Sequence, residues 1–264
     1  DREEKHREEL RSFLPEAAAH CLEAGVMDTA DATQWDTRLK LSGDLAAIKN
    51  AGLVIEAIPE TLPAKKILLQ QMEQFIPAGV LIGSNTSAFP ITELQDGCVH
   101  PERVFGMHWS SHGHVTRFLE LTPGENTSAE AMKLAVKFAE QLGKEPAVLK
   151  KDIPGFLCNR IAYAMYREAV HLLESGVADA EAIEASFRNS VGLWAPMCGP
   201  LRVMDVMGGG AFYAESIKGV LPTMANSTEL QPTLITVGDT YHVVPACSLS
   251  FVIDLCFTVQ GFSV

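Results

Sequence analysis

The stretch GLVIEAIPETLPAKKILLQQMEQFIPAGVLIGS, residues 52–84, decides the fold class of this chain. Residues 52–58 and 80–84 are short runs of mainly apolar side chains, typical of strands that are buried on both faces of a parallel sheet. Between them, residues 62–75 are predicted to form a helix that ends before Pro77. A strand, a helix and a second strand in this order predict a parallel unit of an α/β protein.

The same alternation extends in both directions from this unit. Apolar residues recur at helical spacing in some segments and form short, strand-length runs in others, as far as residue 150. Strands that alternate with helices in this way predict a doubly wound parallel sheet. The further elements that we expect are helices at residues 2–23, 43–49, near Thr92 and at residues 128–142, and strands at residues 38–41, 103–108, 117–122 and 147–150.

The pattern changes after the segment IPGF, residues 153–156. Helices are predicted at residues 159–175 and 180–190, so a second, smaller and mostly α-helical domain begins near Pro154. Beyond about Thr233 the sequence becomes β-branched and apolar, and this tail could add a strand or lack regular structure.

Composition excludes several classes of protein. The net charge of −12 and the absence of Lys/Arg runs argue against nucleic acid as a partner. The six cysteines are scattered without a CxxC pair, which favours reduced thiols in an intracellular protein, with the cytoplasm as the expected compartment. The longest apolar segment, residues 248–259, is too short to span a bilayer and contains Asp254, so no membrane association is expected.

Three histidines and a glutamate stand close together in GMHWSSHGHVTRFLELTPG, residues 106–124. His108, His112 and His114 could be metal ligands if they converge on one ion with carboxylate or thiolate support. Alternatively, one histidine could be a catalytic base that a carboxylate such as Glu120 orients. The spacing permits both readings.

Five blocks in order connect the chain to a known family. They are LVIEAIPETLPAKK, SNTSAFPIT, HPERVFGMHW, FLELTPGENTS and GKEPAVLKKDIPGFLCNRI. Their order and spacing, across about residues 44–205, resemble those of the 3-hydroxyacyl-CoA dehydrogenases. The resemblance implies an α/β, Rossmann-type NAD-binding domain and a helical domain that contributes to the substrate site and usually forms a homodimer. It divides this chain into a partial NAD-binding domain at residues 1–153, a helical substrate and dimerisation domain at 154–233, and a divergent tail at 234–264.

The resemblance also implies an activity, the NAD-dependent oxidation of the 3-hydroxyl of an acyl-CoA to a ketone. It makes His108 the catalytic base, Glu120 its carboxylate partner, Ser87 a hydrogen-bonding residue and Asn159 a contributor near the reacting oxygen. From the residues alone, Asn159 could equally be a helix cap, and Lys65 could be an exposed helix lysine. No metal is expected. The expected NAD contacts are Ala57, Glu60, Lys65, Asn85, Ser87 and Ser111.

Departures from the family pattern define the alternatives. The chain contains no GxGxxG turn, and Gly208–Gly210 follows a helical region rather than a strand, so weak or no NAD binding by this chain is expected. Ser111 stands where the family has asparagine. Together with the acidic first helix and GLWAPMCGP, residues 192–200, this resembles relatives that act on free hydroxy acids such as gulonate or carnitine. A non-catalytic relative that keeps the fold is the third possibility.

Overall fold

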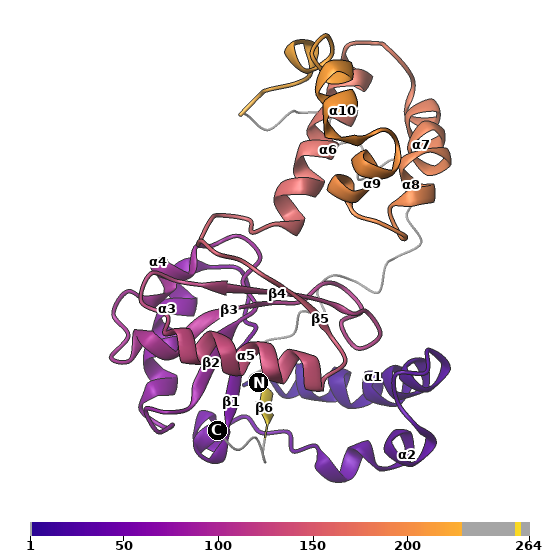
Figure 1. Ribbon diagram of the computed structural model, residues 1–264. Helices are drawn as coiled ribbons and strands as arrows, with labels where there is room; N and C mark the ends of the chain where they lie inside the picture. The colour runs from indigo at the N-terminus through magenta and orange to yellow at the C-terminus, as the bar shows by residue number, and fades with distance from the viewer. Residues whose placement is uncertain (1, 229–256, 260–264) are drawn as a thin grey trace. The chain divides into compact units, whose positions relative to one another are not determined.

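A computed structural model describes residues 2–228 and 257–259, which form two compact units (Figure 1). The first unit extends to Asn159 and includes the strand β6, and the second begins at Arg160. A sheet of order β5-β4-β3-β2-β1-β6 forms the centre of the first unit. Its strands are β1 (Leu53–Glu56), β2 (Leu81–Ser84), β3 (Val104–His108), β4 (Phe118–Pro123), β5 (Glu145–Val148) and β6 (Phe257–Val259).

The β-α-β unit predicted from residues 52–84 is present. Strand β1 runs parallel to β2, with Val54 opposite Ile82, and α3 (Leu62–Glu73) connects them. β2 pairs in parallel with β3 in turn. Together with the helical second unit, this confirms the prediction of an α/β, Rossmann-type fold followed by a smaller helical domain.

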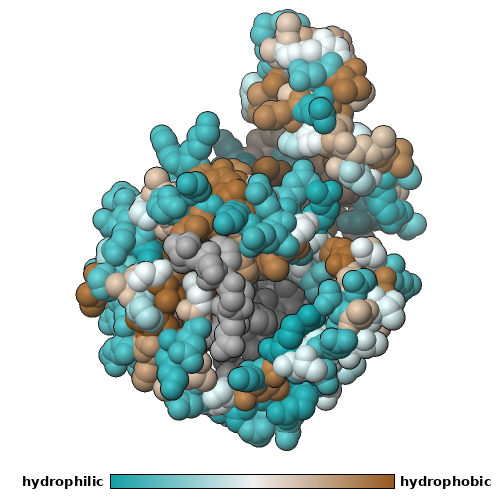
Figure 2. Space-filling view, turned by 60° about the horizontal axis from the view of Figure 1, so that its bottom comes forward, coloured by the Kyte–Doolittle hydropathy of each residue, from teal (hydrophilic) through white to brown (hydrophobic). Residues whose placement is uncertain are grey.

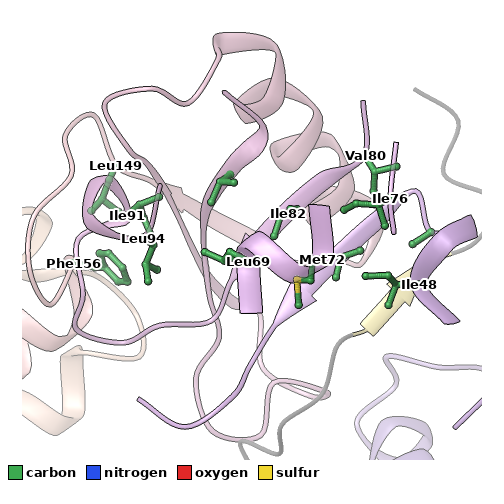
Figure 3. Packing of buried hydrophobic residues seen from close by; sticks show 13 residues of the cluster. Ile48, Leu69, Met72, Ile76, Val80, Ile82, Ile91, Leu94, Leu149 and Phe156 are labelled. Atoms are coloured by element: carbon green, nitrogen blue, oxygen red, sulfur yellow. The ribbon is translucent and has the colours of Figure 1, made fainter. Parts of the chain in front are cut away.

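Side chains alternate between the two faces of the sheet, and helices cover both faces. Val54 and Ile82 pack on one face against Leu69 and Met72 of α3, in the cluster that Figure 3 shows. On the other face, α5 (Ala129–Gln141) contributes Ala131, Ala135, Phe138 and Ala139 to a second cluster around Leu119 and Leu121 of β4. This arrangement explains the uninterrupted apolar runs, since a strand that is covered on both faces has no polar side.

Strand β4 runs antiparallel to β3, which the alternation of strands and helices did not indicate. The connection between them, residues 109–117, is too short for the crossover that a parallel pair needs. β5 is parallel to β4 because α5 forms a full crossover. The sheet is therefore parallel from β1 to β3 and reverses at β4.

One predicted strand is wrong. Residues 38–41 form no strand, because Arg38 is the last residue of α2 (Thr29–Arg38), a helix that was not predicted. The Asp28 side chain caps α2 by accepting a hydrogen bond from the Asp31 amide. The sheet also offers no place for such a strand next to β1, since β6 pairs there antiparallel. The other elements of the first unit are α1 (Glu4–Glu23), η1 (Leu45–Asn50), α4 (Ile91–Gln95) and η2 (Pro101–Arg103).

The second unit is helical, as predicted. It contains most of α6 (Cys158–Glu174), whose first two residues belong to the first unit, and then α7 (Ala180–Asn189), α8 (Val191–Trp194), α9 (Pro200–Val206), α10 (Gly209–Ile217) and η3 (Leu221–Thr223). Gly208 and the first two residues of α10 connect two helices, so this glycine cluster does not follow a strand. Figure 2 shows apolar side chains on the surface of this unit, at the top of the view; Leu193, Met197 and Leu201 are 67%, 80% and 77% exposed.

Most of the divergent tail predicted at residues 234–264 lies outside the described residues. Within it, Phe257–Val259 forms β6, so this part of the tail adds a strand to the sheet. In the described part of the chain, no helix combines the length and the hydrophobicity that crossing a membrane requires.

Candidate active site

His108 and Glu120 form a hydrogen-bonded pair across two strands. His108 is the last residue of β3, and the antiparallel register places Glu120 of β4 directly opposite. The distance from His108 Nδ1 to Glu120 Oε2 is 2.8 Å, and the two residues are only 6% and 1% exposed. Leu119 and Leu121 point into the α5-side core, so strand alternation directs Glu120 to the opposite face. The Glu120 side chain is therefore buried and points into the protein.

The surroundings of His108 leave one ring nitrogen available. The rings of Phe118 and Phe156 lie 5.8 and 5.5 Å from its ring, centroid to centroid. In the tautomer that carries the ring proton on Nδ1, Glu120 accepts that proton and the imidazole lone pair lies on Nε2. Nε2 has no hydrogen-bond partner among the described residues. This geometry can accept a proton at Nε2 and stabilise the resulting imidazolium through Glu120.

The second oxygen of Glu120 faces the start of α6. Glu120 Oε1 accepts hydrogen bonds from the Leu157 amide at 3.1 Å and from the Cys158 amide at 2.8 Å. Asn159, the next residue, donates from Nδ2 to the Ser87 carbonyl oxygen at 2.8 Å. Its side chain therefore contacts the loop after β2, and no hydrogen bond of a helix cap is formed by it in the described chain.

The loop after β2 brings the next two candidate residues to the same edge of the sheet. β2 ends at Ser84, so Ser87 lies in the loop that follows the strand. Asn85 Oδ1 accepts a hydrogen bond from the Trp109 amide at 2.8 Å, which ties this loop to the one that follows His108. The Asn85 Nδ2 group and the Ser87 hydroxyl have no hydrogen-bond partners in the described part of the chain.

Lys65 is buried rather than exposed, at 1% exposure. Its ammonium group lies 2.8 Å from Glu56 Oε1, 2.9 Å from the Ile58 carbonyl oxygen and 3.3 Å from Glu60 Oε2. The alternative of an exposed helix lysine is therefore wrong. Three acceptors match the three ammonium protons, so the hydrogen-bonding capacity of Lys65 is used within the protein. Ala57, which directly follows β1, is 5% exposed.

Glu60 holds the loop after β2 in place through hydrogen bonds to three of its residues. Its Oε1 accepts hydrogen bonds from the Thr86 hydroxyl and from the amides of Ser87 and Ala88, the latter two at 2.9 and 3.0 Å. Burial would raise the pKa of Glu60, but these donors and the Lys65 charge outweigh it and lower that pKa below its usual range. Glu60 thus contacts the loop of Ser87 as an anion.

The other two histidines do not converge with His108. His112 and Ser111 lie in the exposed loop after β3, where Ser111 Oγ is 3.0 Å from His112 Nδ1. The ring of His114 stacks on that of His20 of α1 at 5.8 Å. No group of three or more His, Cys, Asp or Glu side chains within residues 2–228 and 257–259 could hold a metal ion. This geometry gives no support to the metal-site reading.

Several groups at the site were not singled out from the sequence. Glu56, the last residue of β1, is fully buried and contacts Lys65, the Ile58 amide and the Ser84 hydroxyl. An acidic residue at the end of an apolar strand was the available signal. The amides of Leu157 and Cys158 gave no signal, because a backbone group can be placed only by the fold.

Comparison with known proteins identifies the family. Residues 1–153 match the family description "3-hydroxyacyl-CoA dehydrogenase, NAD binding domain", and residues 155–236 match "3-hydroxyacyl-CoA dehydrogenase, C-terminal domain". The chain belongs to the 3-hydroxyacyl-CoA dehydrogenase family. The resemblance of the five sequence blocks is thereby confirmed.

Relatives within the family carry different names. The chain is 34% identical over 195 residues to a probable 3-hydroxybutyryl-CoA dehydrogenase of Bacillus subtilis, covering 74% of this chain and 67% of the relative. It is 35% identical over 166 residues to an L-carnitine dehydrogenase of Oceanobacillus iheyensis, covering 62% and 54%. A solved structure of a 5-formyl-3-hydroxy-2-methylpyridine 4-carboxylic acid 5-dehydrogenase matches with 32% identity and a TM-score of 0.70, covering 75% and 64%. The chain spans about half the length of several curated relatives that it matches.

Proposed function

We propose that this protein is an NAD-dependent dehydrogenase that oxidises the 3-hydroxyl of a 3-hydroxyacyl-CoA to the ketone. The observation that supports this most directly is the 2.8 Å contact between His108 Nδ1 and Glu120, with Nε2 free of partners among the described residues. Oxidation of a secondary alcohol needs a base at the hydroxyl oxygen, because the carbon loses a hydride only as that oxygen loses its proton. A histidine whose tautomer is held by a carboxylate meets this need.

The groups around the site fit the nicotinamide-ribose half of NAD. Asn85 offers an amide donor and Ser87 a hydroxyl, both without partners in the described chain, at the carboxyl edge of parallel strands where open α/β sheets bind ligands. NAD, when bound, supplies the acceptor for the hydride. We propose that Asn85, Ser87, Ala57 and Ser111 contact the cofactor, and that Glu60 and Lys65 act by holding the Ser87 loop.

The remaining steps belong to the protein's own side chains. His108 Nε2 takes the hydroxyl proton, and Glu120 stabilises the positive charge that develops on the ring. Asn159 uses one amide proton on the Ser87 carbonyl, and the other is free to donate to the substrate oxygen. The bond to Ser87 fixes the Asn159 carboxamide before the substrate binds, which reduces the entropy cost of that contact.

The substrate class is the second part of the proposal. An acyl-CoA is favoured by the similarity to a 3-hydroxybutyryl-CoA dehydrogenase, because that match covers more of this chain and of the relative than the match to the L-carnitine dehydrogenase does. A free 3-hydroxy acid of the carnitine or gulonate type is the alternative, supported by the relative named L-carnitine dehydrogenase and by Ser111 in the loop after His108. Both substrates present a secondary hydroxyl to the same base.

The proposal is tested by measuring NADH formation with 3-hydroxybutyryl-CoA, L-carnitine and gulonate as substrates. The measurement is made on this chain and on the longest natural polypeptide that contains it. His108→Gln is expected to lower kcat about 10²- to 10⁴-fold, the usual contribution of a general base. Calorimetry with NAD tests separately the weak binding that the missing GxGxxG turn predicts for this chain, which would leave turnover to the longer polypeptide. Turnover that survives His108→Ala would overturn the assigned base. Absence of turnover with every substrate in the longest polypeptide would favour the non-catalytic relative.

We also propose a homodimer formed through the helical unit. Its support is the apolar surface that Figure 2 shows on this unit, together with the exposure of Leu193, Met197 and Leu201, since exposed apolar patches commonly mark an interface. Light scattering of the purified protein should give twice the monomer mass, and Leu201→Glu should reduce it to the monomer value. A monomer before substitution would contradict the proposal.

A further inference from the structure

The two carboxylate oxygens of Glu120 contact different parts of the chain. Oε2 lies 2.8 Å from His108 Nδ1, whereas Oε1 accepts the amide protons of Leu157 and Cys158. We infer that these two peptide N–H groups are positioning groups for the catalytic base, because they hold Glu120 in the orientation and charge state that His108 needs. The inference rests on the proposed role of His108 and adds the start of α6 to the groups that serve it.

Electrostatics give the amides this importance. Glu120 is 1% exposed, and a buried carboxylate is stable as an anion only where donors replace the lost water. Three donors reach it: one imidazole N–H and two peptide N–H groups. The two peptides begin a 17-residue helix, whose N-terminal partial positive charge adds to the attraction. Without them, His108 alone would stabilise and orient the buried charge.

The position of the two amides is itself fixed by the first unit. Asp152 Oδ2 accepts hydrogen bonds from the Thr92 amide at 2.6 Å and from its hydroxyl at 2.7 Å. The Gly155 amide donates to the Ala88 carbonyl oxygen at 3.1 Å. With the bond from Asn159 to Ser87, residues 152–159 are therefore tied to α4 and to the loop after β2. The Glu120 contacts belong to this hydrogen-bonded segment and are not isolated.

The local helix geometry allows one of the two N–H groups to be removed selectively. Cys158 is the first residue of α6, a position where proline is well tolerated, because its N–H is not needed by the helix and its φ is suitable. Cys158→Pro therefore deletes the 2.8 Å bond to Glu120. Cys158→Ala is the matched reference, because it removes the same thiol and keeps the N–H.

The test compares these two variants by NMR and by kinetics. The proton of His108 Nδ1–H is shielded from exchange and should give a strongly downfield resonance in the protein without cofactor or substrate. In Cys158→Pro this resonance should be displaced or lost relative to Cys158→Ala. The kcat for the substrate that the enzyme uses should be about tenfold lower than in Cys158→Ala, with KM changed less than twofold, since one charge-assisted hydrogen bond is lost.

A second variant covers the case in which the proline variant does not fold, as judged by circular dichroism. Glu120→Gln replaces the anion with a neutral amide, so the Leu157 and Cys158 amide protons should shift upfield and exchange faster with solvent. Unchanged amide protons in this variant would overturn the inference, as would an identical His108 resonance and kcat in the two Cys158 variants. A displaced resonance together with no turnover of any substrate supports the inference and overturns the proposed function.

Discussion

Replacing Lys65 with methionine should destabilise the first unit strongly. The side chain of Lys65 is 1% exposed and that of Glu56 is fully buried, and their charged atoms are 2.8 Å apart. Methionine has nearly the same length but no charge, so the substitution leaves the Glu56 carboxylate buried without its cation. Removal of one partner of a buried ion pair costs about 3–5 kcal/mol, because the remaining charge keeps its desolvation cost without compensation.

The free energy of unfolding can be measured by urea denaturation, followed by circular dichroism and tryptophan fluorescence. An effect of this size corresponds to a fall of the midpoint temperature by ~10 °C for a unit of this size. Lys66→Met is the matched control. Lys66 is the next residue of α3, but its pair with Asp96 lies at the surface, so the urea midpoint should change little.

The double variant separates the charge from the packing. When Glu56→Gln accompanies Lys65→Met, no isolated charge remains between these two positions, and a large part of the loss should be recovered. A loss below about 1 kcal/mol for Lys65→Met would refute the reasoning, because it would place the ammonium group in contact with water. Equal losses in the single and double variants would refute it too, since the cost would then come from packing alone.

Three further predictions concern single groups. Burial and nearby positive charges lower the pKa of His114, so the unfolded state binds more protons than the folded state between the ordinary histidine pKa and the lower folded pKa. The free energy of unfolding should therefore fall as pH decreases from about 6.5 to the folded pKa. The variant His114→Phe should show a smaller fall of the unfolding free energy in this pH range. Burial raises the pKa of the Cys98 thiol to about 11, so at pH 8 roughly a thousandth of it is thiolate. The alkylation rate of Cys98, measured by mass spectrometry, should be far slower in the folded protein than in urea. Equal rates would contradict this prediction. Asp152→Ala removes the acceptor of both Thr92 hydrogen bonds and should cost about 1–3 kcal/mol in urea denaturation, whereas Thr92→Ser, which keeps both donors, should cost less.

Local patterns predicted the elements whose side chains are covered on both faces. The apolar runs at β1 and β2 and the helical spacing of α3 agree with the structure, because burial on two faces leaves a pattern that a single sequence displays. The predicted strand at residues 38–41 failed for the complementary reason. An alternation of only four residues is a weak signal, and helix α2 extends into it as far as Arg38.

Some contacts of the site could be predicted from the sequence and others could not. The pairing of His108 with Glu120 could be predicted because two residues on adjoining strands matched a family pattern. The burial of Lys65 could not, since a lysine in an amphipathic helix is exposed in most proteins and its partner Glu56 is fixed only by the fold. The peptide N–H groups at residues 157 and 158 carry no residue-specific signature at all.

The antiparallel pairing of β3 and β4 makes the distance between His108 and Glu120 independent of the loop that connects the two strands. His108 and Glu120 are cross-strand neighbours, so the spacing of adjacent strands sets the distance between them. The intervening loop, residues 109–117, does not set that distance. Its length and composition can therefore change without altering the distance between the proposed base and its carboxylate partner. Under the proposed function, mutations confined to this loop would leave the His108–Glu120 pair in place while the residues beside it change.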